Sequence, residues 1–203
     1  MALSLNVQAS VLDIRSDSPK SNDVFLVDTN VWYWITYSRA SLSSSLYQVR
    51  DYPSYISQAL RCGAKLFRVD LSFIELANII EKDQYDVFNA INPCKKKEYR
   101  YNYAIERARV VTEIESAWKQ VEKCTQSLPI SVDEQMLEGM KVTLKNYPIE
   151  GYDLCFVEAL KQEGVTGIIT DDCDFTCIPG IQVYTANISA ITAATTQGKI
   201  VVR

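Results

Sequence analysis

Carboxylates are the side chains best placed to do chemistry in this chain of 203 residues. Asp28 and Asp172 each follow an apolar run that has the character of a buried strand, and Asp174 lies two residues further on. Glu75 and Asp153 each lie near the start of an expected helix. Carboxylate oxygens are the ligands that hard divalent cations prefer in proteins. The five acids could therefore hold a metal ion if the fold brings them together.

Two of these acids are surrounded in sequence by apolar residues, at 71–77 and at 154–160. An unpaired ionised carboxylate in such a place costs several kcal/mol, so Glu75 and Asp153 each require a partner. Each acid also has an ordinary structural explanation. Asp28 could cap a helix, Asp153 could favour a helix dipole, Glu75 could pair with a buried arginine, and the acids at 171, 172 and 174 could form a turn.

Composition narrows the chemistry further. The chain contains no histidine, which excludes Ser-His-Asp and Cys-His nucleophiles and Cys2His2 zinc sites. Its six cysteines show no C-x-x-C spacing, so we expect free thiols in a reducing compartment. The formal charge of −4 speaks against a polyanionic partner, but it becomes +1 for the rest of the chain once the five acids are set aside as metal-neutralised. RNA binding is then no longer disfavoured.

The elements that must position the acids alternate between strands and helices. Strands are predicted at 24–27, 65–69, 128–132, 165–170 and 181–185. The continuous apolar run at 24–27 fits a strand that is buried on both faces of a parallel sheet. Helices are expected over 31–37, 53–62, 71–81, 98–126, 133–144 and 151–163, the long one as a single helix or a helical pair. Gly63 and Gly164 stand where helix C-termini favour glycine, and Asp133 stands at an expected helix N-cap. This alternation predicts a mostly parallel sheet with helices on both faces, and it places strand-end acids at one edge.

One domain is expected, over residues 24–186, with a helical insertion at about 84–126 whose first part, 84–97, is rich in turn residues. Residues 1–23 are expected to form an N-terminal arm or an extra edge element, and residues 187–203 a C-terminal tail. The sequence has no apolar stretch as long as a membrane span, and its first ten residues do not resemble a secretory signal. We therefore expect a cytoplasmic protein without a membrane partner.

The candidate acids lie in four ordered motifs. These are Val27-Asp28-Thr29-Asn30, Ser72-Phe73-Ile74-Glu75-Leu76, Gly151-Tyr152-Asp153-Leu154 and Ile169-Thr170-Asp171-Asp172-Cys173-Asp174-Phe175, the last followed by Pro179-Gly180. Together they resemble the PIN-domain ribonucleases, and in particular toxins of the VapC type. The resemblance covers about residues 24–83 and 127–186. It implies a three-layer α/β/α PIN-like fold with a central, mostly parallel sheet.

What the resemblance implies about function is specific. Asp28, Glu75, Asp153 and Asp172 match the family's catalytic and metal-binding acids, and Asp174 matches a more variable metal ligand, although the choice among the three acids of that last motif stays open. The implied cofactor is Mg²⁺ or Mn²⁺. The implied reaction is endonucleolytic hydrolysis of phosphodiester bonds in single-stranded RNA, which needs no histidine.

Several alternatives remain open from the sequence. The protein could be a toxin inhibited by an antitoxin, an RNA-processing or antiviral enzyme, or a non-catalytic PIN-like module that binds RNA or a protein, and it could form a homodimer. A phosphatase of the haloacid dehalogenase type would require an aspartate where Asn30 stands. The segment 95–109 mixes Lys, Arg and Tyr, so it could contact RNA or simply form a solvated helix face. We expect the insertion to set the choice of substrate or partner.

Overall fold

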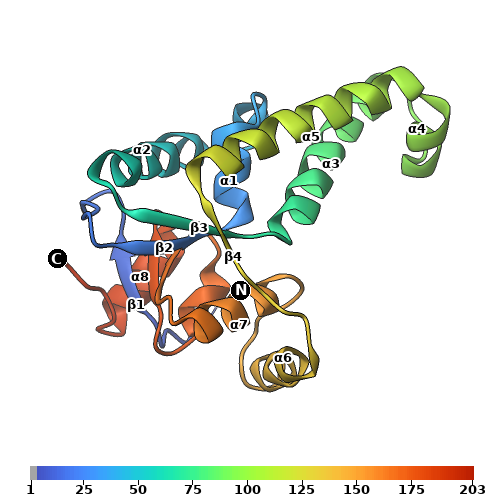
Figure 1. Ribbon diagram of the computed structural model, residues 1–203. Coiled ribbons are helices and arrows are strands. Elements are labelled where there is room, and N and C mark those ends of the chain that lie inside the picture. Colours follow the sequence, from blue (N-terminus) through green and yellow to red (C-terminus); the bar gives the residue numbers. More distant parts are fainter. Residues whose placement is uncertain (1–3) are drawn as a thin grey trace.

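The computed structural model describes residues 4–203 and contains a six-stranded sheet with helices on both faces (Figure 1). The strand order is β1-β6-β5-β2-β3-β4, and every neighbouring pair is parallel. The strands are β1 (Ser10–Asp13), β2 (Val24–Val27), β3 (Lys65–Val69), β4 (Gln126–Leu128), β5 (Gly167–Ile169) and β6 (Gln182–Thr185). The expected three-layer α/β/α class is confirmed.

The central strands β2 and β5 are short apolar runs because both faces of the sheet are covered there. Phe25 and Val27 belong to the hydrophobic core on one face, whereas Leu26 between them belongs to the core on the other. Ile168 and Ile169 divide between the two cores in the same way. Successive side chains of a strand point to opposite faces, so a strand buried on both sides shows no polar alternation.

The helices form the two outer layers. On one face lie α1 (Thr29–Thr36), α2 (Leu46–Cys62), α3 (Ser72–Ile91) and α5 (Ala104–Cys124), with α4 (Lys96–Asn102) between the last two. On the other face lie α7 (Asp153–Glu163) and α8 (Ile188–Thr196), and α6 (Glu134–Asn146) packs on α7 (Figure 1). Two short 3₁₀ turns complete the described elements, η1 (Ala40–Leu42) and η2 (Cys173–Cys177).

Local signals set several helix ends as expected. Gly63 ends α2 and Gly164 ends α7, with φ of 87° and 64°, in the left-handed conformation that favours glycine. The Asp133 side chain caps α6 by accepting a hydrogen bond from the Met136 N–H at 2.9 Å. Helix α2 begins seven residues before the expected start at 53, because Ser45 and Gln48 form a capping box there.

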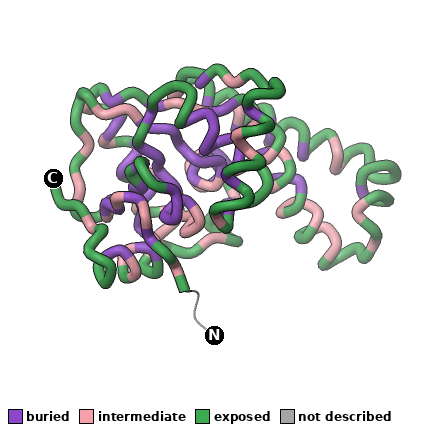
Figure 2. Tube along the Cα trace, turned by 90° about the horizontal axis from the view of Figure 1, so that it is seen from below, coloured by how far each residue is buried: buried purple, intermediate pink, exposed green. Residues whose placement is uncertain are grey.

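The insertion is more helical than the sequence suggests. Residues 84–91, expected to be turns, continue α3, and only 92–95 separate it from α4. The expected long helix is a helical pair, α4 and α5, and α3 and α5 run together away from the sheet (Figure 1). Figure 2 shows that this arm is exposed along most of its length. Buried Glu81 ties its helices together by ion pairs with Lys96, Arg100 and Arg107, so part of the basic segment 95–109 has a structural role.

Both chain ends contribute to the sheet unit. Part of the expected N-terminal arm forms edge strand β1, which pairs with β6, and residues 1–3 lie outside the described residues. The expected C-terminal tail forms α8 and a bridge from Ile200 to Val11.

Strand β4 ends at Leu128 rather than at the expected residue 132, because Pro129 has no N–H to continue the ladder of hydrogen bonds. All six cysteines are free, as expected. Over residues 4–203, no helix has the length and apolar character of a membrane span.

Candidate active site

Four segments of the chain deliver acidic side chains to the carboxyl ends of the central strands. Asp28 follows β2 directly, Asp172 and Asp174 lie in the turn after β5, and Glu75 and Asp153 lie in the first turns of α3 and α7. Strand β2 lies between β5 and β3, so the chain leaves it toward one side and returns on the other. Open parallel sheets bind ligands at such a switch point, because the loops after the two strands diverge there.

A chain of hydrogen bonds around Thr170 orders two of these acids. The Thr170 hydroxyl donates to Oδ2 of Asp28 at 2.7 Å and accepts from the Asp172 N–H at 2.9 Å. Oδ1 of Asp172 in turn accepts from the Asp174 N–H at 2.8 Å. The side chain of Asp28 makes no capping bond to α1. Asp28 therefore occupies the N-cap position of α1 without capping it through its side chain, and its carboxylate is held toward the β5 turn.

Burial and mutual repulsion perturb the two most central acids. Asp28 is 2% exposed. This burial, followed by the charges of Glu75 and Asp172, raises the pKa of Asp28 to about 7. Burial, followed by the charges of Asp28, Asp172, Glu75 and Asp174, raises the pKa of Asp153 to about 8. A helix N-terminus favours a negative charge, so the raised pKa of Asp153 indicates that its acidic surroundings outweigh the dipole. Asp153 thus lies within electrostatic reach of the four other predicted acids.

Glu75 and Asp174 also have raised pKa values. Burial and the charge of Asp172 raise the pKa of Glu75, and burial, Asp172 and then Glu150 raise the pKa of Asp174. Oε2 of Glu75 is buried and makes no hydrogen bond of normal geometry in the described part of the chain, although the Thr29 hydroxyl lies close enough to offset part of the rise in the pKa of Glu75. Glu75 also has no ion pair there, so it does not pair with a buried arginine. A buried carboxylate oxygen without a partner is the kind of group that a cation would satisfy.

Asp171 points away from this group and serves the structure instead. Its carboxylate accepts hydrogen bonds from Tyr47 Oη at 2.8 Å, Gln48 Nε2 at 2.7 Å and Tyr52 Oη at 2.6 Å, all on α2. The turn after β5 therefore uses Asp171 to hold α2 and leaves Asp172 beside the other acids. The sequence did not reveal the role of Tyr52, because no local pattern links it to a turn more than a hundred residues away.

The residues present fit a hard divalent cation by chemical type. They supply carboxylate oxygens, one of them buried without a partner, and the repulsion that raises their pKa values would be relieved by a positive charge. Asp28, Glu75, Asp153 and Asp172 would hold such an ion, with Asp174 at the edge. Within residues 4–203, no three acidic or thiol side chains are already spaced to hold a metal ion. Binding would thus require these carboxylates to move closer together.

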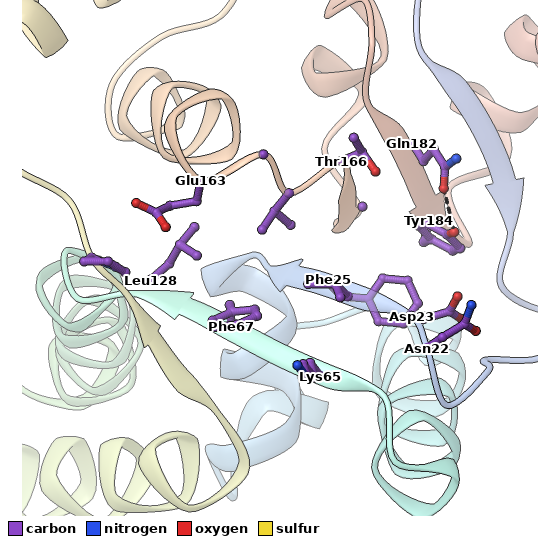
Figure 3. A pocket seen from close by; sticks show the side chains of 15 residues that line it. Asn22, Asp23, Phe25, Lys65, Phe67, Leu128, Glu163, Thr166, Gln182 and Tyr184 are labelled. Atoms are coloured by element: carbon purple, nitrogen blue, oxygen red, sulfur yellow. Dashed lines mark hydrogen bonds between the residues drawn. The ribbon is translucent and has the colours of Figure 1, made fainter.

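Two cavities lie at opposite ends of the sheet. A cavity of about 500 Å³ opens at the amino ends of the strands, where Lys65 and Gln182 line it together with Phe25 and Tyr184 (Figure 3). It contains none of the predicted acids. A smaller cavity of about 320 Å³ lies beside α1 and α3, near the carboxyl ends of the strands, and Asn30 contributes to its wall. The acidic group and the smaller cavity share the end of the sheet where function is expected.

No protein-family model matches the chain, and no curated protein matches its sequence. Membership of the PIN family therefore remains a prediction from the four motifs. Function has to be inferred from the chemistry of the site itself, since one fold can carry many activities.

Proposed function

We propose that the protein is a divalent-metal-dependent endoribonuclease of the PIN type, which hydrolyses phosphodiester bonds of single-stranded RNA with Mg²⁺ or Mn²⁺ as its cofactor. The observation that carries this proposal is the convergence of acids from four separate segments without a cation. None of Asp28, Glu75, Asp153, Asp172 and Asp174 forms an ion pair with Lys or Arg within residues 4–203.

The energetic argument favours function over stability. Buried carboxylates that repel one another destabilise a fold, and a purely structural role would be served better by neutral or apolar side chains. Perturbed pKa values from burial plus neighbouring charges are typical of functional sites. An acid group at a sheet switch point is therefore most simply explained by a ligand that carries positive charge.

The chain's own residues have distinct tasks in this proposal. Thr170 fixes the orientation of Asp28 and, through the Asp172 N–H, the turn that carries Asp172. Asp153 and Glu75 contribute negative charge from α7 and α3. This charge attracts a cation, and without the cation it would repel the phosphate of the substrate. A bound Mg²⁺ or Mn²⁺ supplies Lewis acidity and neutralises charge on the phosphate. A carboxylate of the group accepts the proton of the attacking water.

Cleavage of a mixed pool of labelled single-stranded RNA tests the proposal. We expect cutting that requires Mg²⁺ or Mn²⁺ and that disappears in Asp28→Asn and in Asp153→Asn. Asp133→Asn is the matched control, because Asn caps a helix as well as Asp and this position lies on α6, outside the acidic group. All variants are checked for folding by circular dichroism.

The outcome separates the nuclease from a binding module. No cutting with either metal, combined with tight RNA or protein binding by the wild type, would favour the non-catalytic PIN-like alternative. Equal cutting by wild type and Asp28→Asn would refute the assignment of the site. If the RNA pool is cut, a second assay tests the biological role. Growth arrest when the wild type is expressed, but not when Asp28→Asn is expressed, would favour a toxin over an RNA-processing enzyme.

A further inference from the structure

The cavity of about 320 Å³ begins one helical turn beyond the acidic group. Glu75 lies in the first turn of α3, and Ile79, Lys82, Asp83 and Asp86 follow it at the spacing of one helix face. The last four of these side chains line the cavity. The face of α3 that presents Glu75 to the site thus continues directly into the wall of the cavity.

The opposite wall comes from segments that also hold the site. Asn30 lies two residues after Asp28, and Gln48 donates a hydrogen bond to Asp171, the neighbour of Asp172, at 2.7 Å. A ligand in the cavity would therefore lie beside any phosphate at the acidic group. The volume is at the lower end of the range of about 300–1,000 Å³ for small-molecule sites, which suits a single nucleotide.

The lining combines aromatic surface with a carboxylate that lacks a counter-ion. Trp34 and Tyr33 contribute the aromatic surface, and the Trp34 ring lies 5.1 Å from the ring of Tyr52, the residue that binds Asp171. Asp83 forms no ion pair in the part of the chain that the structure describes. Asp83 and Tyr33 line the same cavity, and burial followed by the nearby charge of Asp83 raises the pKa of Tyr33.

An ionised carboxylate only accepts hydrogen bonds, and this property selects among the RNA bases. Guanine alone has two adjacent donors, N1–H and the exocyclic amine, on its Watson–Crick edge, whereas adenine, cytosine and uracil each pair a donor with an acceptor there. A carboxylate can accept both guanine donors at once. Lys82, which has no ion pair within residues 4–203, adds a donor suited to the guanine O6.

We propose that this cavity binds a guanine base of the RNA next to the scissile phosphate, and that Asp83 is the residue that selects it. The inference rests on the proposed ribonuclease function, because it places the base of the same substrate. Trp34 contacts the flat face of the base, and Asp83 accepts hydrogen bonds from its edge. The nuclease accordingly cuts single-stranded RNA beside guanine.

Binding of mononucleotides tests the cavity without any cleavage. Dissociation constants of GMP, AMP, CMP and UMP are measured by calorimetry in the presence of a chelator, with the full chain. We expect GMP to bind about tenfold to hundredfold more tightly than the other three, which is the discrimination of one bidentate contact. Asp83→Asn should lose that preference and gain affinity for AMP, because Asn offers one donor and one acceptor. Glu115→Gln removes the same charge from the exposed surface of α5 and should change nothing.

Two results would overturn the inference: equal affinity for the four nucleotides, or an unchanged GMP affinity in folded Asp83→Asn. If Asp83→Asn fails to fold, sequencing of the RNA ends made by the wild type decides, since cuts without a neighbouring guanine contradict the inference. The outcomes also separate the two proposals. Metal-dependent cutting at all bases refutes only guanine selection, whereas selective GMP binding without any cutting refutes only the nuclease.

Discussion

Replacing Asp28 by Asn should stabilise the protein while it removes activity. The substitution keeps the shape of the side chain and an oxygen that can accept the hydrogen bond from the Thr170 hydroxyl, 2.7 Å away in the wild type. It removes the negative charge from a side chain that is 2% exposed and that faces the charges of Glu75 and Asp172. A residue that served stability would have the opposite effect when replaced.

The magnitude follows from the pKa of the Asp28 carboxyl. Burial and the neighbouring acids raise this pKa from 3.8 to about 7 in the folded protein. Each unit corresponds to about 1.4 kcal/mol, so a folded chain that holds the ionised Asp28 above pH 7 is destabilised by about 4 kcal/mol relative to a neutral side chain. Movement of the acidic side chains in the folded protein would relieve part of their repulsion, so about 4 kcal/mol is an upper value for the destabilisation.

The sign of the pH dependence is also defined. The folded state binds the Asp28 proton more tightly than the unfolded state, so the stability of the wild type falls as pH rises from about 4 to about 7. The variant lacks this titration. The free energy of unfolding of Asp28→Asn should therefore equal that of the wild type near pH 4 and exceed it by up to about 4 kcal/mol at pH 8.

Urea unfolding in the presence of a chelator, at pH 4.5 and at pH 8, measures this difference. Asp133→Asn makes the same chemical change at an exposed helix cap and should show no comparable rise between the two pH values. Added Mg²⁺ should stabilise the wild type more than Asp28→Asn, because a ligand of the folded state raises its stability. A variant that is less stable than the wild type at pH 8, or a difference that is the same at both pH values, would refute the reasoning.

Three further substitutions test other parts of the structure. Thr170→Val removes the hydroxyl that orients Asp28 and should reduce RNA cleavage by tenfold or more, whereas Thr170→Ser should retain it; similar rates for both would contradict the positioning role. Tyr52→Phe leaves Asp171 without its 2.6 Å donor and should lower the free energy of unfolding by about 1–3 kcal/mol, measured by urea titration. Glu81→Gln should cost about 1–3 kcal/mol at pH 7 and less at pH 3, because its three cationic partners lower the pKa of Glu81 and its contribution is lost as pH falls through that lowered pKa; equal costs at both pH values would contradict this.

Features with a local physical cause could be predicted from the sequence. The continuous apolar run at 24–27 indicates a strand buried on both faces, and Gly63, Gly164 and Asp133 indicate helix ends, all of which the structure confirms. The position of Asp28 directly after an apolar run likewise predicts its place at the carboxyl edge of the sheet. Each of these features depends on neighbours within a few residues, and such short-range preferences are written in the sequence.

Local signals were less informative where tertiary contacts compete with them. Residues 84–91 contain turn-forming asparagine, yet they extend α3 because Tyr85 and Phe88 pack against the core through Tyr99. The apolar residues after Pro129 suggested a strand, but the ladder with β3 ends at Leu128. In both places the contact that decides the conformation comes from another segment.

The choice between Asp171 and Asp172 was decided only by the tertiary structure. The two residues are adjacent and chemically identical, so no sequence pattern can tell which one faces the other acids. The packing of α2 decides, because Tyr47, Gln48 and Tyr52 hold Asp171 and leave Asp172 beside Asp28. The sequence alone determined which chemistry the chain could perform; the packing of distant helices determined which carboxylates share one site and where a cavity lies beside them.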